Sequence, residues 1–307
     1  MLLDVDRLPA PGEEVFSSAR VELLGGSAVN TGVVLKRLGH EVTVLGAVGE
    51  DDAGTKALQL LSEVGLATDH VSRATEEPTA MNTVLVTPDG ERTMVGARGA
   101  NVTYSQPETW PDGLDWLHIS GYAFREGRQR ETAQEMLREA AEREIPASLD
   151  VPTGVGAEIR TAVGSSLGHF ALVSGSSESM TELTGETEPT KTLIDAGVRL
   201  VAASSGAKPL ILTRPGETIS VTPPSVDPID ATGAGDALMA GLIAGTLAGL
   251  ELGPTAVLAS SAGAAATLAQ GASQTLDDRP TWLDLLDECR WIDADPRWIE
   301  SVRELAR

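Results

Sequence analysis

The segment with the clearest chemical potential is Asp230–Leu242, which reads Asp-Ala-Thr-Gly-Ala-Gly-Asp-Ala-Leu-Met-Ala-Gly-Leu. Its small residues Gly233, Ala234 and Gly235 let the backbone curl tightly at the start of an expected helix. The free N–H groups of a helix N-terminus point into such a curl and bind phosphate oxygens, or charge that develops during group transfer. Asp236 lies in the first turn, where the helix dipole favours its ionised form. A carboxylate beside an anion site is suited to accept the proton of an attacking hydroxyl.

The composition of this loop excludes two common phosphate-binding motifs. A Walker loop needs Gly-Lys-Ser/Thr, and the dinucleotide fingerprint needs a preceding strand and a third glycine. A bare GxGD pattern is also compatible with a tight loop that ends in an acidic helix cap and does no chemistry. The two interpretations stay open for the short pattern, and only the longer string favours the anion site.

Gly25, Gly26 and Asn30 form a second candidate site. Two glycines allow a ligand to approach the backbone closely. Asn30 lies one turn into an expected helix and offers both a hydrogen-bond donor and an acceptor, as recognition of a polyol requires. Taken alone, the segment is equally well explained as a Gly-Gly turn followed by a solvated asparagine.

Single residues elsewhere have less decisive contexts. Arg98 could reach an anionic group of a substrate, or it could be a solvated arginine. Thr213 ends an expected strand and either faces a nucleotide or only caps the strand. The four histidines lack metal-ligand spacing, and the single cysteine, Cys289, lies in an amphipathic tail without an activating charge.

Alternating strands and helices must position these residues. The pattern predicts helices at about 27–38, 54–65, 128–143, 157–163, 190–204, 234–250 and 254–270, and strands at 15–23, 42–48, 79–86, 91–95, 117–120, 147–150, 170–174, 210–213 and 218–221. Such alternation implies a mostly parallel sheet covered on both faces. Residues 13–23 and 79–95 break this order and predict a small separate β layer, with a hairpin turn at Pro88-Asp89-Gly90.

The composition narrows the function classes. The formal net charge of -22 argues against binding to nucleic acid and to anionic membrane surfaces. A single cysteine excludes an intramolecular disulfide and suits a reducing cytoplasm. The longest apolar stretch, around 237–250, is too short and too rich in glycine to span a bilayer. The first residues show no signal-peptide pattern.

Together the two glycine motifs, about 200 residues apart, resemble the two signatures of the ribokinase-like (PfkB) carbohydrate kinase family. The segments Pro9–Glu14, Gly99–Asn101 and Ala259–Ala272 also resemble the family. The resemblance implies an α/β fold, a Rossmann-like αβα sandwich with a mostly parallel central sheet. It implies one kinase domain over residues 1–307, with β-lid segments at about 10–24 and 78–101.

The implied activity is ATP-dependent phosphorylation of a hydroxyl on a small sugar or sugar derivative. The alternatives are a nucleoside kinase of adenosine or pseudouridine type, and a degenerate member that binds ligand without turnover. Mg²⁺ would arrive with ATP, the enzyme would be cytoplasmic, and a homodimer could form through the lid.

Site roles follow residue by residue from the resemblance. Asp236 would be the catalytic base, and residues 233–235 the anion hole. Gly25, Gly26, Asn30 and Arg98 would bind the substrate. Thr213, Thr232, Ser260 and Gly263 would contact the nucleotide, and a monovalent cation such as K⁺ would be held by Asp230, Thr232, Gly271 and Thr275.

Three departures from the family pattern are visible. Ser176 and Ser179 stand where an AsnxxGlu motif is expected to organise Mg²⁺ and phosphate. The segment from Thr213 to Asp230 is about ten residues shorter than expected, as if a strand and turn were missing. Only Met1–Val5 remain to fill the place of the first central strand, so we expect an upstream segment of strand character that carries an Asp.

Overall fold

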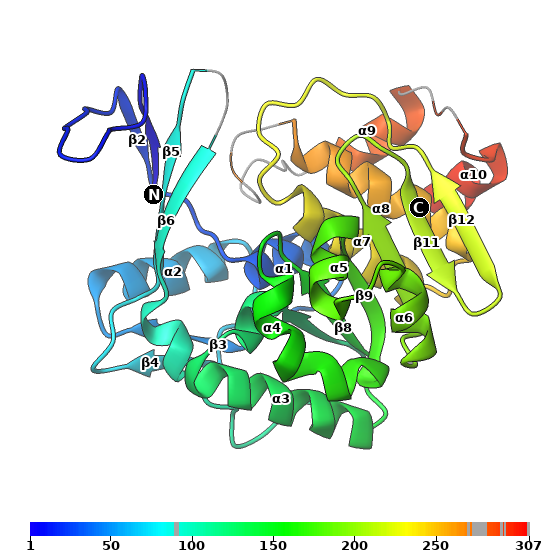
Figure 1. The fold of residues 1–307 in the computed structure, drawn as a ribbon, viewed down its shortest axis with the longest axis horizontal. Coiled ribbons are helices and arrows are strands. Elements are labelled where there is room, and N and C mark those ends of the chain that lie inside the picture. The colour runs from blue at the N-terminus through cyan, green and yellow to red at the C-terminus, as the bar shows by residue number, and fades with distance from the viewer. Residues whose placement is uncertain (89–91, 269–270, 272–280, 289–290, 292, 306–307) are drawn as a thin grey trace.

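The strands after residue 116 form one six-stranded sheet in a computed structural model, which describes residues 1–88, 92–268, 271, 281–288, 291 and 293–305. The order is β12-β11-β10-β9-β8-β7 (Figure 1). Strands β7 to β10 are parallel, and β11 and β12 are antiparallel additions at one edge. The bounds are Leu117–Ser120 (β7), Ala147–Val151 (β8), Phe170–Ser176 (β9), Leu200–Ser204 (β10), Leu210–Arg214 (β11) and Glu217–Val221 (β12).

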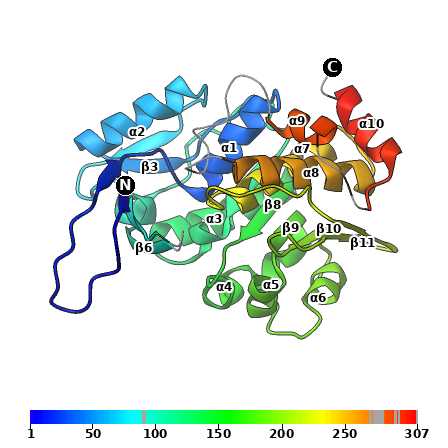
Figure 2. The same ribbon diagram turned by 90° about the horizontal axis from the view of Figure 1, so that it is seen from above.

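Helices cover both faces of this sheet (Figure 2). In β10, Leu200 and Ala202 join the apolar core under α7 and α8, whereas Val201 and Ala203 join the core under α3 to α6. This alternation confirms the predicted αβα sandwich. The first group is α1 (Ser27–Arg37), α7 (Ala234–Leu247), α8 (Leu252–Ala266), α9 (Thr281–Glu288) and α10 (Pro296–Leu305); the second is α3 (Gly127–Glu142), α4 (Gly156–Val163), α5 (Ser177–Thr184) and α6 (Pro189–Asp195).

A separate four-stranded sheet has the order β2-β1-β5-β6 and is called the lid below. Its strands are β1 (Leu2–Asp4), β2 (Ala19–Val21), β5 (Met81–Val86) and β6 (Arg92–Ala97). Figure 1 shows this sheet standing away from the sandwich. The predicted hairpin is confirmed by the antiparallel pairing of β5 with β6. The strand predicted at 15–23 is much shorter, because only Ala19–Val21 finds a partner, which is β1.

The first residues lie in the lid and not in the main sheet. β1 pairs antiparallel with β2 and parallel with β5. The expectation that Met1–Val5 would fill a central place is therefore wrong. A short parallel pair, β3 (Gly46–Gly49) and β4 (Val71–Ala74), flanks α2 (Asp52–Glu63) in sequence; the strand expected from Val42 begins only at Gly46.

The helix predicted over 190–204 is wrong in its second half. Helix α6 ends at Asp195, and Gly197 adopts a φ of 102°, which ends the helix. The chain then enters β10, which pairs in parallel with β9. The last strand of the parallel series is therefore β10. Leu210–Thr213 belongs to β11, the first of the two antiparallel strands that follow β10. The expected loss of a strand and turn came from this misassignment.

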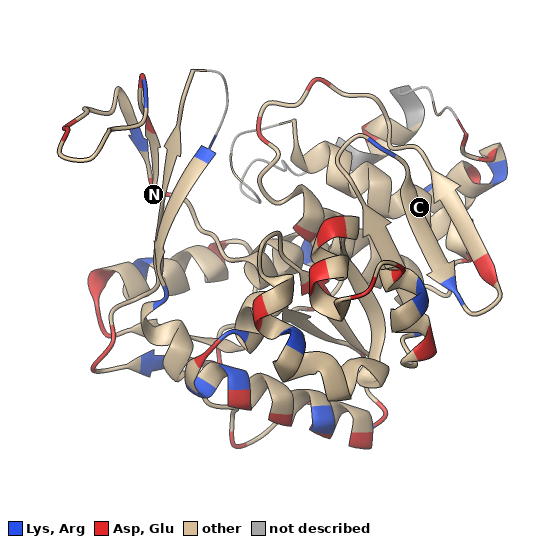
Figure 3. Ribbon diagram, viewed as in Figure 1, with Lys and Arg blue, Asp and Glu red and all other residues tan. Residues whose placement is uncertain are grey.

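Charge is distributed unevenly over the helices (Figure 3). Asp236 is the only charged residue in α7 and α8, whereas α3 carries many charges on its exposed side. Helix α8 is buried over its whole length and α7 is buried from Ala237 to Gly245, which explains their apolar composition. Among the described residues, no helix is both long and apolar enough to cross a membrane.

Candidate active site

The N-terminus of α7 is shaped by one residue in the left-handed region. Gly233 caps the helix with a φ of 82° and a ψ of 0°, a conformation that favours glycine. Ala237 N donates to Gly233 O at 2.8 Å, which begins the helical ladder. The amides of the first turn precede this ladder and are directed along the helix axis. Ala234 N donates to Ala231 O at 3.3 Å, and the anion site at 233–235 stays a prediction with which this helix start is compatible.

Asp236 is held by three polar side chains of α1. Ser27 Oγ donates to Asp236 Oδ1 at 2.8 Å, and Asn30 Nδ2 donates to Asp236 Oδ2 at 2.7 Å. Thr31 Oγ1 donates to the backbone oxygen of Asp236 at 3.2 Å. Burial raises the pKa of Asp236, while the hydrogen bonds from Asn30 and Ser27 work in the opposite direction. The two glycine motifs, distant in sequence, meet at this carboxylate.

The side-chain amide of Asn30 uses its Nδ2 to contact Asp236, while its Oδ1 has no hydrogen-bond partner in the structure. The residue is 6% exposed, and its Oδ1 is buried without a hydrogen-bond partner. A buried acceptor of this kind normally finds a donor, such as a substrate hydroxyl. Gly26, immediately before α1, has a φ of 112° that favours glycine, and a side chain on Gly25 would meet nothing within 4 Å. The surroundings of these residues are thus compatible with the predicted substrate side of the site.

Asp150 is an acidic residue beside Asp236 that the sequence interpretation missed. It lies at the carboxyl end of β8, between Ser120 of β7 and Ser174 of β9 in the register. Burial, together with the negative charge of Asp236, raises the pKa of Asp150 to about 8. The pKa of Tyr122, just past β7, is raised by burial and by the charges of both carboxylates. An acidic residue at the carboxyl end of a buried parallel strand was the available signal.

Residues 230–235, which comprise the loop before α7 and the first two residues of that helix, are called the anion loop below. Asp230 Oδ1 accepts from Thr232 N at 2.8 Å and from Thr232 Oγ1 at 2.7 Å, and Asp230 Oδ2 accepts from Gly271 N at 3.0 Å. The residues predicted to hold a cation therefore do converge, apart from Thr275, which lies outside the described residues. A contact that was not predicted joins them: Arg92 of the lid forms an ion pair with Asp230.

Helix α8 packs closely against the start of α7. A side chain on Gly263 would lie 3.2 Å from Ala234 O and 3.4 Å from Leu238 Cβ, so glycine allows the two helices to approach. Ser260 is 2% exposed, and its Oγ is buried without a partner. The structure thus places Gly263 against the anion loop. The hydroxyl of Ser260 is a buried polar group that can still form a hydrogen bond.

This combination of lid, sandwich and paired glycine motifs agrees with comparisons to known proteins. Residues 3–279 match the pfkB family of carbohydrate kinases. The chain belongs to this family. It is 30% identical to the aminoimidazole riboside kinase of Salmonella typhimurium, over 82% of this chain and 84% of that protein. It is 26% identical to the ribokinase of Arabidopsis thaliana, over 92% of this chain and 77% of that protein.

Solved structures show the same fold. The Arabidopsis thaliana ribokinase complexed with ribose and ATP has a TM-score of 0.76 and 23% identity, covering 92% of this chain and 94% of that one. The nucleoside kinase of Methanocaldococcus jannaschii has a TM-score of 0.77 at 18% identity, covering 98% and 94%. The pfkB relatives are phosphotransferases that act on sugar hydroxyls, and this chain is a carbohydrate kinase of that family.

Arg98, which was predicted to bind the substrate of the pfkB site, contacts the turn after β7 and helix α3. Arg98 Nη2 donates to Tyr122 O at 2.9 Å and to Gln129 Oε1 at 2.5 Å, and Arg98 Nε lies 3.6 Å from Glu126 Oε1. Burial lowers the pKa of Arg98. The guanidinium group therefore ties the base of the lid to α3 and to the turn at 121–124, and its Nη2 is already engaged.

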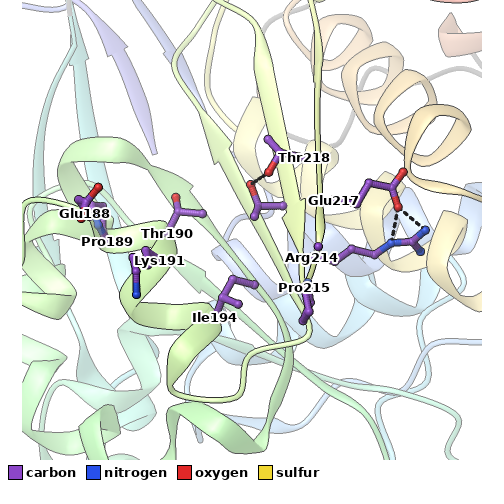
Figure 4. A pocket seen from close by; sticks show the side chains of 11 residues that line it. Glu188, Pro189, Thr190, Lys191, Ile194, Arg214, Pro215, Glu217 and Thr218 are labelled. Atoms are coloured by element: carbon purple, nitrogen blue, oxygen red, sulfur yellow. Dashed lines mark hydrogen bonds and ion pairs between the residues drawn. The ribbon is translucent and has the colours of Figure 1, made fainter.

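Thr213 lies at the edge of the sheet opposite the anion loop. It pairs with Val201 near the start of β10, whereas Asp150 and Ser176 lie at or near the ends of β8 and β9. Thr213 lines a cavity of about 560 Å³ between α6 and the β11–β12 turn (Figure 4). Because β11 runs antiparallel, its carboxyl end is far from the strand ends that surround Asp236. The structure therefore does not support Thr213 as a contact to the nucleotide.

The positions of the missing AsnxxGlu motif have a structural role here. Ser176 caps α5 by accepting from Ser179 N at 3.0 Å, and the two hydroxyls lie 2.9 Å apart. Neither residue is acidic. Asp150, on the neighbouring strand, is the carboxyl group that the structure brings toward Asp236.

Proposed function

We propose that this pfkB kinase transfers the γ-phosphoryl group of ATP to a hydroxyl of a small sugar or sugar derivative. The observation that carries the proposal is the position of Asp236, held at the N-terminus of α7 by Ser27 and Asn30. A carboxylate fixed beside a row of helix amides can remove a proton while charge accumulates next to it. The curated relatives include ribokinases and a fructokinase, which supports the acceptor class.

In this proposal the residues of the chain have separate tasks. Asn30 Oδ1 accepts a hydrogen bond from the acceptor molecule and orients it, while Nδ2 of the same amide keeps Asp236 in place. Asp236 takes the proton of the attacking hydroxyl, and the amides of the anion loop stabilise the charge on the transferred group. The lid covers the acceptor, which limits transfer to water.

Mg²⁺ bound to ATP would neutralise part of the phosphate charge. The described residues contain no group of three or more His, Cys, Asp or Glu that could hold a metal. We infer that the ion is held mainly by phosphates and water, and Asp150, on which the charge of Asp236 acts, is a further carboxyl group near the site. Ser260 Oγ is a suitable partner for the nucleotide, since it is buried and unpaired.

A nucleoside is a second candidate acceptor. The relative that is 30% identical is an aminoimidazole riboside kinase, whose name indicates a riboside substrate. Recognition of the ribose hydroxyls by Asn30 would be the same for both acceptors. The difference would lie in whether the pocket also accepts a planar base.

The experiment is a panel of free sugars, sugar phosphates and ribosides, each incubated with Mg·ATP while ADP release is recorded. Mass spectrometry of the product then shows whether the acceptor gained a phosphoryl group. We expect ADP release that depends on one acceptor class and yields a phosphorylated product. ADP release that is equal with and without every acceptor would contradict the proposal.

We also propose a cytoplasmic enzyme that dimerises through its lid. A reducing compartment suits a chain with one cysteine, and ATP is available there. Apolar side chains are exposed on the lid, including Phe16 at 81%, Met94 at 53% and Val95 at 68%. Sedimentation analysis tests the dimer, and a monomer at micromolar concentration would contradict it.

A further inference from the structure

The side chain of Asp230 is 8% exposed, and its carboxylate accepts several hydrogen bonds and forms an ion pair. Thr232 supplies two hydrogen bonds and Gly271 one, and Arg92 Nη1 contacts Asp230 Oδ1 at 2.5 Å. Burial alone would raise the pKa of Asp230, but these hydrogen bonds and the charge of Arg92 lower it on balance. Asp230 is therefore an ionised, buried group whose compensating charge comes from the protein.

Arg92 belongs to the lid sheet, whereas Asp230 belongs to the anion loop. Arg92 is the first residue of β6 in the lid hairpin, opposite Val86 of β5. Asp230 begins the anion loop, three residues before Gly233, and its backbone N–H donates to Thr267 O, just after α8, at 3.1 Å. The ion pair thus spans 138 residues of sequence and connects the lid directly to the anion loop.

Among the described residues of the expected cation site, a cation supplied by the protein stands beside Asp230. A bound K⁺ needs converging oxygen atoms with no competing cation beside them. Here the guanidinium group of Arg92 already lies against the Asp230 carboxylate and neutralises it. The donor set is that of a protein-supplied cation.

We propose that Arg92 is a positioning residue whose guanidinium replaces a monovalent cation at Asp230 and makes closure of the lid hairpin a condition for an ordered anion loop. This inference rests on the proposed kinase function. It goes further in assigning a lid residue to the ordering of the transfer site. An uncompensated buried carboxylate is unfavourable, so the loop loses its ordered conformation when Arg92 is withdrawn. Lid closure over the acceptor and preparation of the anion site then occur together.

The experiment compares wild type, Arg92→Gln and Arg20→Gln. Arg20 is a matched control, since it is a lid arginine paired with the exposed Glu22. Rates are measured in K⁺ and in tetramethylammonium at equal ionic strength. We expect wild type and R20Q to differ less than twofold between the two salts. For R92Q we expect at least a tenfold loss of kcat in tetramethylammonium, with partial recovery in K⁺ and a smaller change in the KM of the acceptor.

Thermal unfolding supplies a readout that does not depend on activity. K⁺ should raise the Tm of R92Q relative to tetramethylammonium and leave the Tm of wild type unchanged. The Tm effects of R92Q and Asp230→Asn should be non-additive in the double variant. If no acceptor is phosphorylated, the proposed function fails, but these unfolding results still decide whether Arg92 supplies the cation.

Two results would overturn the inference. The first is strong stimulation of the wild type by K⁺, because a cation would then bind despite Arg92. The second is an R92Q variant that loses Tm but has the same kcat in both salts. That result would make the ion pair a structural tie between lid and sandwich, without a role in ordering the anion loop.

Discussion

Replacing Asp236 by Asn isolates the proton-accepting role of this side chain. The amide has the shape of the carboxylate, and its oxygen can accept from Asn30 Nδ2 as Asp236 Oδ2 does now. The Ser27 hydroxyl can rotate and accept from the new amide group, since a hydroxyl is both donor and acceptor. The position of α1 against α7 should therefore persist, and only the basic group is lost.

The expected loss follows from the role of a general base. Removing such a group reduces kcat by about 10²–10⁴-fold, or about 2.7–5.4 kcal/mol of transition-state stabilisation. The thermal stability of D236N, unlike its kcat, should not fall. Burial raises the pKa of Asp236, so its ionised form at pH 7 is less favourable in the folded state than in the unfolded state. The neutral D236N variant should unfold at the same or a higher temperature.

The assay is acceptor-dependent ADP release together with thermal unfolding at pH 7. Asp52→Asn is the matched control, because Asp52 also occupies the first turn of a helix but is exposed and distant from α7 in sequence. D52N should retain wild-type kcat. A D236N variant with near-normal kcat, or an equal loss in D52N, would refute the assignment. A D236N variant with a much lower Tm would show that the amide does not reproduce the contacts to α1.

Two further predictions concern stability. The pKa of Asp150 is about 8 in the folded state against 3.8 ordinarily, so the folded protein retains a proton that the unfolded chain has lost, and stability should fall as pH rises from about 4 through 8. Unfolding temperatures recorded from pH 5 to pH 9 should decline less steeply in Asp150→Asn than in wild type, and parallel curves would contradict the pKa. A Cβ on Gly241 would lie 2.6 Å from Ala259 Cα, so Gly241→Ala should lower both Tm and kcat by separating α7 from α8. Gly164→Ala, whose Cβ would meet nothing within 4 Å, should leave both unchanged, and equal behaviour of the two variants would disprove the packing argument.

Local chemistry made much of the fold predictable. Helix α1 begins after Gly26 and ends before Gly39, which has a φ of 92°, as the glycine pattern indicated. The tight start of α7 at Gly233 followed from small residues in sequence. These features depend on the backbone conformations that glycine and other small residues allow within a few positions, and these residues can be seen directly in the sequence. The same approach failed at Leu200–Ser204, where alanine-rich sequence suits a helix but pairing with β9 decides for a strand.

The sequence by itself determined the family signatures and the residue types of the transfer site, namely Asp236 with the glycines before it. Only the tertiary structure decided how these residues work together. It places Asn30 in hydrogen-bonding contact with Asp236 and Arg92 in an ion pair with Asp230. It also brings Asp150 close enough to Asp236 for the charge of Asp236 to raise the pKa of Asp150. It also places Thr213 away from the site. Contacts between residues so distant in sequence depend on sheet order and helix packing, and no local pattern in the chain encodes them.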